Sequence, residues 1–209
     1  MLKSFGLLTV SVIIFFAVML TYGNLLRCKE TPLREVLEKK KIERIENPKI
    51  IVETENNTLK FFDGKNLIKK YNVDLGHSDF NLVKVRKNYC TTPKGIFSIC
   101  KETNSEKFYK KFQLSYPDSF YIYEAEKLSL ISKKKASTML KNLRYGCSIS
   151  FDKKIFGPKI YIHGFGKANF ILKNLPFIFN WTNGSIALSN EDLDELSPYL
   201  NIGMKIIII

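Results

Sequence analysis

The sequence predicts a mostly β domain with a few short helices, preceded by one N-terminal transmembrane helix. Residues 4–26 carry no charged side chain, which separates this stretch from the rest of the chain. Beyond residue 48, short apolar runs alternate with turn signals, as they do in β proteins. We therefore divide the 209 residues into a membrane anchor (1–30), a juxtamembrane spacer helix or linker (31–48) and one folded domain (49–209).

The N-terminal stretch is long enough to cross a bilayer. Residues 5–20 are almost wholly apolar. A helix over 4–26, rising about 1.5 Å per residue, exceeds a hydrocarbon core of about 30 Å. A cleaved signal peptide is the alternative, but no small-residue cleavage site follows the apolar run. Lipid attachment at Cys28 is disfavoured because the large, charged Arg27 precedes it. We expect an uncleaved anchor.

The charges that flank this anchor favour a domain that stays in the cytoplasm. The amino-terminal side has Lys3, whereas the C-terminal side has Arg27, Lys29, Arg34 and Lys39–Lys41. By loop charge, the C-terminal part would stay in the cytoplasm. Long domains translocate largely regardless of such charge, so the flanks do not decide the topology.

The whole chain is strongly basic. Its formal net charge is +13, and many of its lysines occur in short runs. A single run is usually a solvated face, but the total favours anionic surroundings such as lipid headgroups, wall polymers or nucleic acid. The sequence contains no helix-turn-helix, zinc-finger or RRM pattern, so we expect no nucleic-acid partner.

Histidine and cysteine are too sparse to indicate a metal site. The chain has His77, His163 and four cysteines, none in a Cys-x-x-Cys or His-x-x-x-His spacing. We expect neither a metal ion nor a cofactor. Cys90 and Cys100 could bridge a loop if the domain is extracytoplasmic, and reduced, partly buried thiols are the equal alternative.

Local patterns predict most of the strands. We expect strands at 49–53, 58–62, 66–75 and 159–163, a turn into a strand at 92–97, and a closing strand at 205–209. Asp63-Gly64 lies between two apolar runs and predicts a hairpin there.

Three helices are expected outside the membrane anchor. Thr31-Pro32 is a typical helix start, and the helix would run over 33–46. A second helix, over 128–142, would be an insertion above the sheet. A third follows Ser189, where a Ser-x-x-acid pattern caps the helix, and its apolar face consists of Leu193, Leu196 and Leu200.

Two segments carry the chemical signal of the chain: Ile162-His163-Gly164 and Asn180-Trp181-Thr182-Asn183-Gly184-Ser185-Ile186-Ala187-Leu188. Together they resemble the active site of the L,D-transpeptidase (YkuD-type) catalytic domain, whose pattern reads roughly Asp-Trp-Thr-x-Gly-Cys-Ile-Ala-Leu. Thr92-Pro93-Lys94-Gly95-Ile96-Phe97, with Gly76 before it and Tyr116-Pro117 after it, resembles a further signature of that family. The resemblance spans roughly residues 50–209 and departs at the nucleophile, where Ser185 stands in place of cysteine.

The resemblance implies a β-sandwich or barrel that acts on the stem peptides of peptidoglycan, in cell wall biogenesis and cell shape. The anchored domain would then lie on the extracytoplasmic side of a bacterial plasma membrane, in the periplasm or wall. By resemblance, His163 is the base and Ser185 occupies the position of the nucleophile. The neighbouring substrate or oxyanion residues would be Gly164, Trp181, Thr182 and Gly184.

These residues also have structural interpretations. A histidine that ends an apolar strand is often a core residue, and Trp181 suits packing as well as the wall of a site. The partner motif favours the catalytic interpretation of His163. We expect backbone N–H groups around Gly184 and Ser185 to face a carbonyl oxygen, and the Thr182 hydroxyl to bond near His163.

Serine at position 185 changes the expected chemistry. A cysteine–histidine pair can rest as thiolate and imidazolium, because a thiol pKa of about 8.5 is within reach of imidazole. An alcohol must lose its proton during attack, and the imidazolium formed then normally has an orienting carboxylate, which the motif lacks. We expect activity to fall by orders of magnitude, at about 4 kcal/mol of barrier per thousandfold.

This serine leaves three interpretations open. The chain is a weakened L,D-transpeptidase, or it is an inactive module of the same fold that binds wall peptides or regulates an active relative. Alternatively, the serine replaces a cysteine that the natural protein carries. Cys147, in Gly146-Cys147, mimics a Gly-Cys turn, but it precedes the histidine strand, so we do not expect it to replace the nucleophile.

Overall fold

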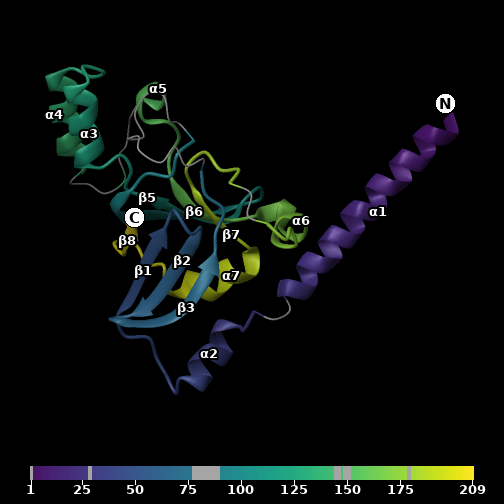
Figure 1. Ribbon diagram of the computed structural model, residues 1–209. Coiled ribbons are helices and arrows are strands. Elements are labelled where there is room, and N and C mark those ends of the chain that lie inside the picture. Colours follow the sequence, from purple (N-terminus) through teal and green to yellow (C-terminus); the bar gives the residue numbers. More distant parts are fainter. Residues whose placement is uncertain (1, 28–29, 77–89, 144–146, 148–151, 178–179) are drawn as a thin grey trace.

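A computed structural model describes residues 2–27, 30–76, 90–143, 147, 152–177 and 180–209. In this part of the chain, eight strands form one mixed sheet in the order β3-β2-β1-β8-β4-β5-β6-β7 (Figure 1). β1 pairs with β8 and β6 with β7 in parallel, whereas the other neighbours are antiparallel. The predicted fold class is confirmed. The strands are β1 (Pro48–Glu53), β2 (Thr58–Asp63), β3 (Asn66–Asn72), β4 (Gly95–Ser105), β5 (Tyr109–Leu114), β6 (Tyr161–Gly164), β7 (Ile186–Leu188) and β8 (Lys205–Ile208).

The two ends of this strand order are joined to each other. Just after β3, Asp74 pairs with Ala187 of β7, and Gly76 pairs with Thr182. Asp74 and Ala187 exchange two backbone hydrogen bonds, of 2.9 Å and 2.8 Å between nitrogen and oxygen. The sheet therefore closes on itself, and it closes at the segment in which the sequence predicted the functional site.

Alternating burial accounts for the first hairpin. In β1, Ile50 and Val52 are fully buried while their neighbours are partly exposed, which is the period of two expected of a strand covered on one face. β2 repeats this pattern and pairs with β3 in antiparallel fashion. The hairpin predicted at Asp63-Gly64 is confirmed, since β2 ends and β3 begins on either side of it.

Seven α-helices occur among the described residues, with two short 3₁₀ turns. They are α1 (Leu2–Arg27), α2 (Leu33–Lys39), α3 (Ser119–Lys127), α4 (Lys133–Asn142), α5 (Lys153–Phe156), α6 (Asn169–Lys173) and α7 (Asn190–Leu196), with η2 (Gly166–Ala168) and η3 (Ser197–Tyr199).

Two of the helix predictions need correction. The spacer helix α2 ends at Lys39 instead of residue 46, because Lys41 adopts a φ of 56° that a helix cannot continue through. The helix expected at 128–142 begins later, at Lys133, and forms α4, because Ser132 caps it by accepting a hydrogen bond of 3.3 Å from the N–H of Lys135. α3, which ends at Lys127, was not predicted.

The helix predicted after Ser189 is confirmed together with its cap. The Ser189 hydroxyl oxygen accepts a hydrogen bond of 3.1 Å from the N–H of Asp192. Leu193, Leu196 and Leu200 are all buried, as their shared face requires. α7 thereby packs against the sheet directly after β7 and fixes the end of that strand (Figure 1).

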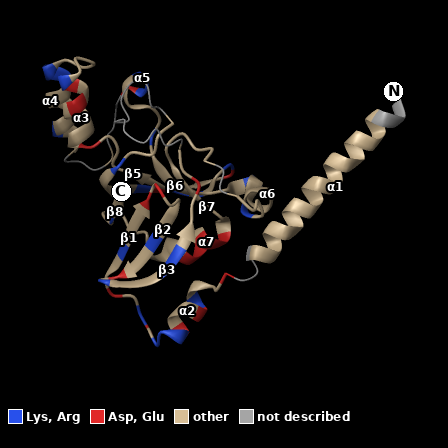
Figure 2. Ribbon diagram, viewed as in Figure 1, with Lys and Arg blue, Asp and Glu red and all other residues tan. Residues whose placement is uncertain are grey.

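Helix α1 extends away from the sheet (Figure 1). Its residues Phe5–Leu26 are long and apolar enough to cross a membrane by length and composition. Figure 2 shows no Lys, Arg, Asp or Glu along most of its length, in contrast to the charged surface of the domain. A signal sequence passes the same test, so the uncleaved anchor stays a prediction.

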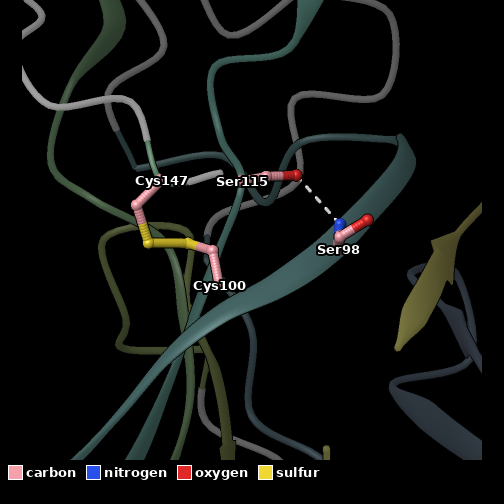
Figure 3. Close-up of a disulfide and its surroundings, with 4 residues drawn as sticks. All are labelled: Ser98, Cys100, Ser115 and Cys147. Carbon is pink, nitrogen blue, oxygen red and sulfur yellow. Dashed lines mark hydrogen bonds between the residues drawn. A yellow bond between two sulfur atoms is a disulfide. The ribbon is translucent and has the colours of Figure 1, made fainter. Parts of the chain in front are cut away.

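A disulfide joins Cys100 of β4 to Cys147 (Figure 3). Cys90 is free and exposed. The bridge between Cys90 and Cys100 that we considered possible is therefore wrong, because Cys100 bonds to Cys147. Cys147 lies 47 residues from Cys100 in the sequence, but the fold brings their Cα atoms to 5.2 Å from each other. A Cys147 whose sulfur is bonded cannot act as a nucleophile, and this also excludes its role as a replacement for residue 185.

Peptide mapping tests this pairing directly. Trypsin separates the three cysteines into peptides 88–94, 95–101 and 145–153. Alkylation without reductant, followed by digestion and mass spectrometry, should yield 95–101 linked to 145–153 and an alkylated 88–94. After reduction, all three peptides should carry the alkyl group. A linked 88–94 and 95–101 pair would contradict the structure.

Candidate functional site

Paired strands bring the site residues onto one face of the sheet. β6 lies between β5 and β7, with His163 opposite Lys111 on one side and Ala187 on the other. Ala187 is in turn opposite Asp74. Residues directly opposite each other in a ladder point to the same face. A cross-strand row, Lys111–His163–Ala187–Asp74, therefore carries a cation at one end, a carboxylate at the other and the imidazole between them.

Ser185 lies on the same face, directly before β7. The parallel register that pairs Ile162 with Ile186 puts Ser185 beside Tyr161, and the Ser185 hydroxyl oxygen accepts a hydrogen bond of 3.2 Å from the N–H of Tyr161. Tyr161 and His163 are two residues apart, so their side chains share a face. The structure thus brings Ser185 and His163 together on adjacent strands. Among the described residues, no hydrogen bond joins their side chains.

His163 is buried, with 5% of its surface exposed, and its ring orientation is fixed. Its Nδ1 lies 2.8 Å from the carbonyl oxygen of Gly164. A carbonyl oxygen only accepts, so this bond requires the hydrogen on Nδ1. The neutral ring therefore presents Nε2 as an acceptor, which is the form that a general base needs. The Phe108 ring packs against the imidazole at 4.8 Å between centroids.

The surroundings of His163 keep the imidazole neutral. Burial lowers the pKa of this imidazole, because the charged form loses its hydration. The bond to the Gly164 carbonyl opposes this effect and the positive charge of Lys111 adds to it, so that the pKa falls from 6.5 to about 4. At pH 7 the resting ring is therefore an unprotonated base.

Trp181 connects His163 to a carboxylate that the sequence analysis missed. Its indole Nε1–H donates a hydrogen bond of 2.9 Å to Oδ2 of Asp74, which is 8% exposed. The ring also meets His163 edge to face, with centroids 6.0 Å apart. The indole thus spans the row across the small side chain of Ala187. Trp181 packs against both His163 and Asp74, and its role in the wall of a substrate site stays a prediction.

The turn before Ser185 is held by Thr182. Its hydroxyl donates a hydrogen bond of 2.6 Å to the carbonyl oxygen of Ser185 and accepts one of 3.2 Å from the N–H of Gly184. Gly184 has a φ of 98°, a conformation that disfavours any side chain. The N–H of Gly184 and the hydroxyl of Thr182 are thus engaged inside the turn, and the oxyanion role of Gly184 and a bond from Thr182 near His163 stay predictions.

The same turn packs closely against Gly76. A Cβ on Gly76 would lie 1.7 Å from the carbonyl oxygen of Cys90 and 2.7 Å from the nitrogen of Gly184, so no larger residue fits. The hydroxyl of Thr92 accepts a 2.9 Å hydrogen bond from the Gly76 N–H. Thr92, the first residue of the Thr-Pro-x-Gly signature, thus supports the turn through Gly76. The free thiol of Cys90 borders the site, 3.4 Å from Oδ1 of Asn183.

Asn180, the first residue of the motif, secures the closure of the sheet. Its Oδ1 accepts hydrogen bonds from the Leu75 N–H at 2.9 Å and from the Asn57 side chain. An amide can do this as well as the acid of the family pattern, because the oxygen acts only as an acceptor. Within the described residues, no three His, Cys, Asp or Glu side chains gather as a metal site requires. The expected lack of a metal stays a prediction.

The chain is similar to one protein family and to several solved structures. The model of the L,D-transpeptidase catalytic domain (YkuD) family matches residues 47–208. No curated protein matches the chain. Among solved structures, Bd1075 of Bdellovibrio bacteriovorus is 16% identical, with a TM-score of 0.47, over 79% of this chain and 48% of its own.

Two further solved structures are similar to the chain. An L,D-transpeptidase from Xylanimonas cellulosilytica is 12% identical, with a TM-score of 0.45, over 86% of this chain and 70% of its own. The helical cell shape determining protein Pgp2 of Campylobacter jejuni is 15% identical, with a TM-score of 0.46, over 84% and 54%. The chain spans about half the length of the Bdellovibrio and Campylobacter proteins.

Proton NMR of the histidine rings tests the environment of His163. One of the two histidine signals should stay in the neutral form until about pH 4, and His163→Asn should remove that signal. Lys111→Met should raise the pKa of His163, because it removes a neighbouring positive charge. A His163 signal that titrates near 6.5 would show that the ring is solvated instead.

This pKa shift also makes stability depend on pH. Between about pH 6.5 and 4, the unfolded chain protonates this imidazole while the folded chain does not. The free energy of unfolding should therefore fall as pH falls through that window, by about 3 kcal/mol at most. Above it, both states are neutral and the term vanishes. Urea unfolding at several pH values measures this free energy for the wild-type chain and for His163→Asn. If the free energy of unfolding changed equally with pH in both chains between pH 6.5 and 4, the prediction would be wrong.

Trp181→Phe tests the bridge to Asp74. The change keeps an aromatic ring but removes the indole donor from a buried carboxylate, so the free energy of unfolding should drop by about 1–3 kcal/mol. Circular dichroism should follow the unfolding, since Trp181 is the only tryptophan. A double-mutant cycle with Asp74→Ala supplies the control, and additive effects would mean that the two side chains do not interact.

Proposed function

We propose that this chain, which belongs to the L,D-transpeptidase catalytic domain family, acts on peptidoglycan stem peptides through an acyl-enzyme at Ser185, with His163 as general base. One observation carries the proposal. Ser185 and His163 lie on one face of adjacent parallel strands, and the Nδ1 bond leaves Nε2 available to accept a proton. The family match covers residues 47–208, and we propose that this domain performs the reaction in the cell.

The proposed reaction has two halves. In the first, Ser185 Oγ attacks a stem-peptide carbonyl carbon while His163 Nε2 takes the hydroxyl proton. The C–N bond then breaks, and His163 returns that proton to the departing amine. In the second, a stem amine or water attacks the ester carbon, His163 takes its proton, and the serine oxygen leaves and regains a proton from His163. Transfer to an amine forms a cross-link, whereas transfer to water is hydrolysis.

The site should perform this chemistry slowly. Serine cannot rest as an alkoxide, so an imidazolium must form as the serine attacks. Burial and Lys111 disfavour that cation, as the pKa of about 4 for His163 records. Asp74 is separated from His163 by Ala187 in the row and reaches it through Trp181, so it does not accept directly from Nδ1. Each addition of about 4 kcal/mol to the activation barrier, relative to a cysteine enzyme, would slow the reaction about a thousandfold.

Charge complementarity supports an anionic substrate. Lys111 stands directly opposite His163, with its Nζ 4.8 Å from the ring centroid of Tyr161. A carboxylate of a stem peptide would gain a cation there, beside the reacting residues. The net charge of +13 favours association with anionic wall polymers in the same way.

A second candidate function is a binding or regulatory module that performs no turnover. The observation that favours it is the state of Ser185, whose oxygen accepts from the Tyr161 N–H and shares no hydrogen bond with His163 within the described residues. Such a module would keep the face that carries His163, the basic charge and the closed sheet while lacking the cysteine. It would hold stem peptides without forming an adduct.

The disulfide supports an extracytoplasmic location for either function. Disulfides persist in oxidising compartments and are rare in the cytosol of mesophiles. The Cys100–Cys147 bond therefore opposes the cytoplasmic topology that the basic residues after α1 favour. We propose that α1 anchors the chain in a bacterial plasma membrane and that the domain faces the periplasm or wall.

Restoring the family nucleophile tests the catalytic proposal. Ser185→Cys should raise acyl transfer or hydrolysis of purified muropeptides by about a thousandfold or more, with an adduct on residue 185 visible by mass spectrometry. Adding His163→Ala should remove that gain. Cys90→Ser in the same background should keep it, which excludes the neighbouring thiol as the nucleophile.

The outcome also separates the two candidates. If the wild-type chain forms a slow product or an adduct that Ser185→Ala abolishes, the enzyme proposal holds. Measurable muropeptide binding with neither product nor adduct, in the wild-type chain and in Ser185→Cys alike, would leave the binding module and overturn the acyl-enzyme.

A further inference from the structure

Apolar side chains are exposed together around α6. Phe170 and Ile171 of this short helix are 67% and 55% exposed, and Phe177, shortly after it, is 55% exposed. Large apolar side chains scattered singly are normal on a surface, but three within eight residues are not. The structure therefore presents a local apolar surface, here called the α6 surface (Phe170, Ile171 and Phe177).

The α6 surface adjoins the end of the predicted membrane helix. Gly23 of α1 is buried, and a Cβ built on it would lie 1.8 Å from the carbonyl oxygen of Asn174. Only glycine permits this approach of the helix to the backbone that follows α6. Figure 1 shows α6 beside the end of α1 that faces the domain. The membrane helix and the α6 surface are therefore parts of one packed unit.

The length of α1 places this contact at the membrane surface. A hydrocarbon core of about 30 Å takes about 20 helical residues at 1.5 Å each. A span that begins near Phe5 then reaches the headgroups near Gly23. The backbone at Asn174 meets α1 at this level, so the neighbouring Phe170 and Ile171 lie where apolar chains and headgroups meet.

Positive charge accompanies these apolar residues. Lys167, in the 3₁₀ turn just before α6, is exposed, and so is Lys107, in the turn between β4 and β5. The two turns touch, because a Cβ on Gly166 would lie 1.8 Å from the carbonyl oxygen of Lys107. Aromatic and aliphatic side chains with flanking lysines are the combination that binds the interface of an anionic membrane.

From these observations we infer that the α6 surface is a second membrane contact, which inserts Phe170, Ile171 and Phe177 at the boundary of headgroups and acyl chains. The inference rests on the proposed anchoring by α1. A helix alone lets a domain rotate above the bilayer, whereas two contacts fix its orientation. Gly23 and Asp74 both line a pocket of about 440 Å³ next to α6, so the carboxylate end of the cross-strand row faces the membrane side.

Site-directed spin labelling of the full chain tests the inference. The chain would be reconstituted in liposomes of phosphatidylethanolamine and phosphatidylglycerol, with Cys28→Ser and Cys90→Ser to remove the other thiols and the Cys100–Cys147 bond left intact. Phe170→Cys carries the label, and Phe120→Cys is the matched control, since Phe120 is 52% exposed on α3, away from α1 (Figure 1). Collisions with oxygen report lipid, and collisions with a water-soluble nickel chelate report water.

The label at position 170 should collide several-fold more with oxygen than with the nickel chelate, and the label at position 120 should show the reverse. Adding Phe170→Glu to an Ile171→Cys label should move that label towards water, because a charge is expelled from the interface. Equal aqueous exposure at 170 and 120 overturns the inference. Protection of position 170 from both reagents indicates a protein partner and also overturns it.

A separate measurement isolates the anchoring. If alkaline carbonate extracts the full chain from membranes, the α1 anchor fails and the second contact fails with it. If the chain is retained and position 170 is aqueous, only the second contact fails. The muropeptide assays decide the catalytic proposal independently of both results.

Discussion

The site depends on one constraint, the backbone pairing that closes the sheet between Asp74 and Ala187. Without this pair, β7 would be an edge strand, and the β6–β7 register that puts Ser185 beside Tyr161 would be held from one side only. A slip of one residue would turn every side chain of the pairing strand to the other face. Two backbone hydrogen bonds, the Asn180 side chain and the indole of Trp181 all secure this junction. The motif residues around the nucleophile position thus serve the closure as well as any chemistry.

This dual use explains why the other motif residues keep their contacts although residue 185 is a serine. Thr182 and Gly184 form the turn, and Trp181 holds a buried carboxylate, whichever side chain residue 185 has. Burial sets the reactivity of His163, because it favours the neutral imidazole and is the main cause of a pKa of about 4. A neutral base suits proton abstraction, but the same burial penalises the imidazolium that an alcohol must generate. Structure and chemistry therefore place different demands on the same residues, and only the chemistry requires cysteine.

Local signals predicted what depends on a few consecutive residues. The hairpin at Asp63-Gly64 and the capped helix after Ser189 follow from turn and cap chemistry that acts within four residues. The resemblance supplied His163 and its motif partner. The Asp74 carboxylate and the Cys100–Cys147 bond were missed, because each depends on which strands become neighbours. The alternation in Val73-Asp74-Leu75-Gly76, an acid between buried apolar residues, was the one available signal for a buried carboxylate.

The conflict over topology has a physical resolution. Basic residues after a membrane helix favour the cytoplasm, a disulfide favours the opposite side, and a long domain translocates largely regardless of flanking charge. If the α6 surface lies in the interface, lysines such as Lys107 and Lys167 meet anionic headgroups instead of water. Each such contact contributes about 1 kcal/mol, so a few of them hold the domain against the bilayer on whichever side it folds. These lysines stabilise an orientation on the membrane after translocation. They differ from the residues that flank α1, whose charge a long domain overrides during translocation.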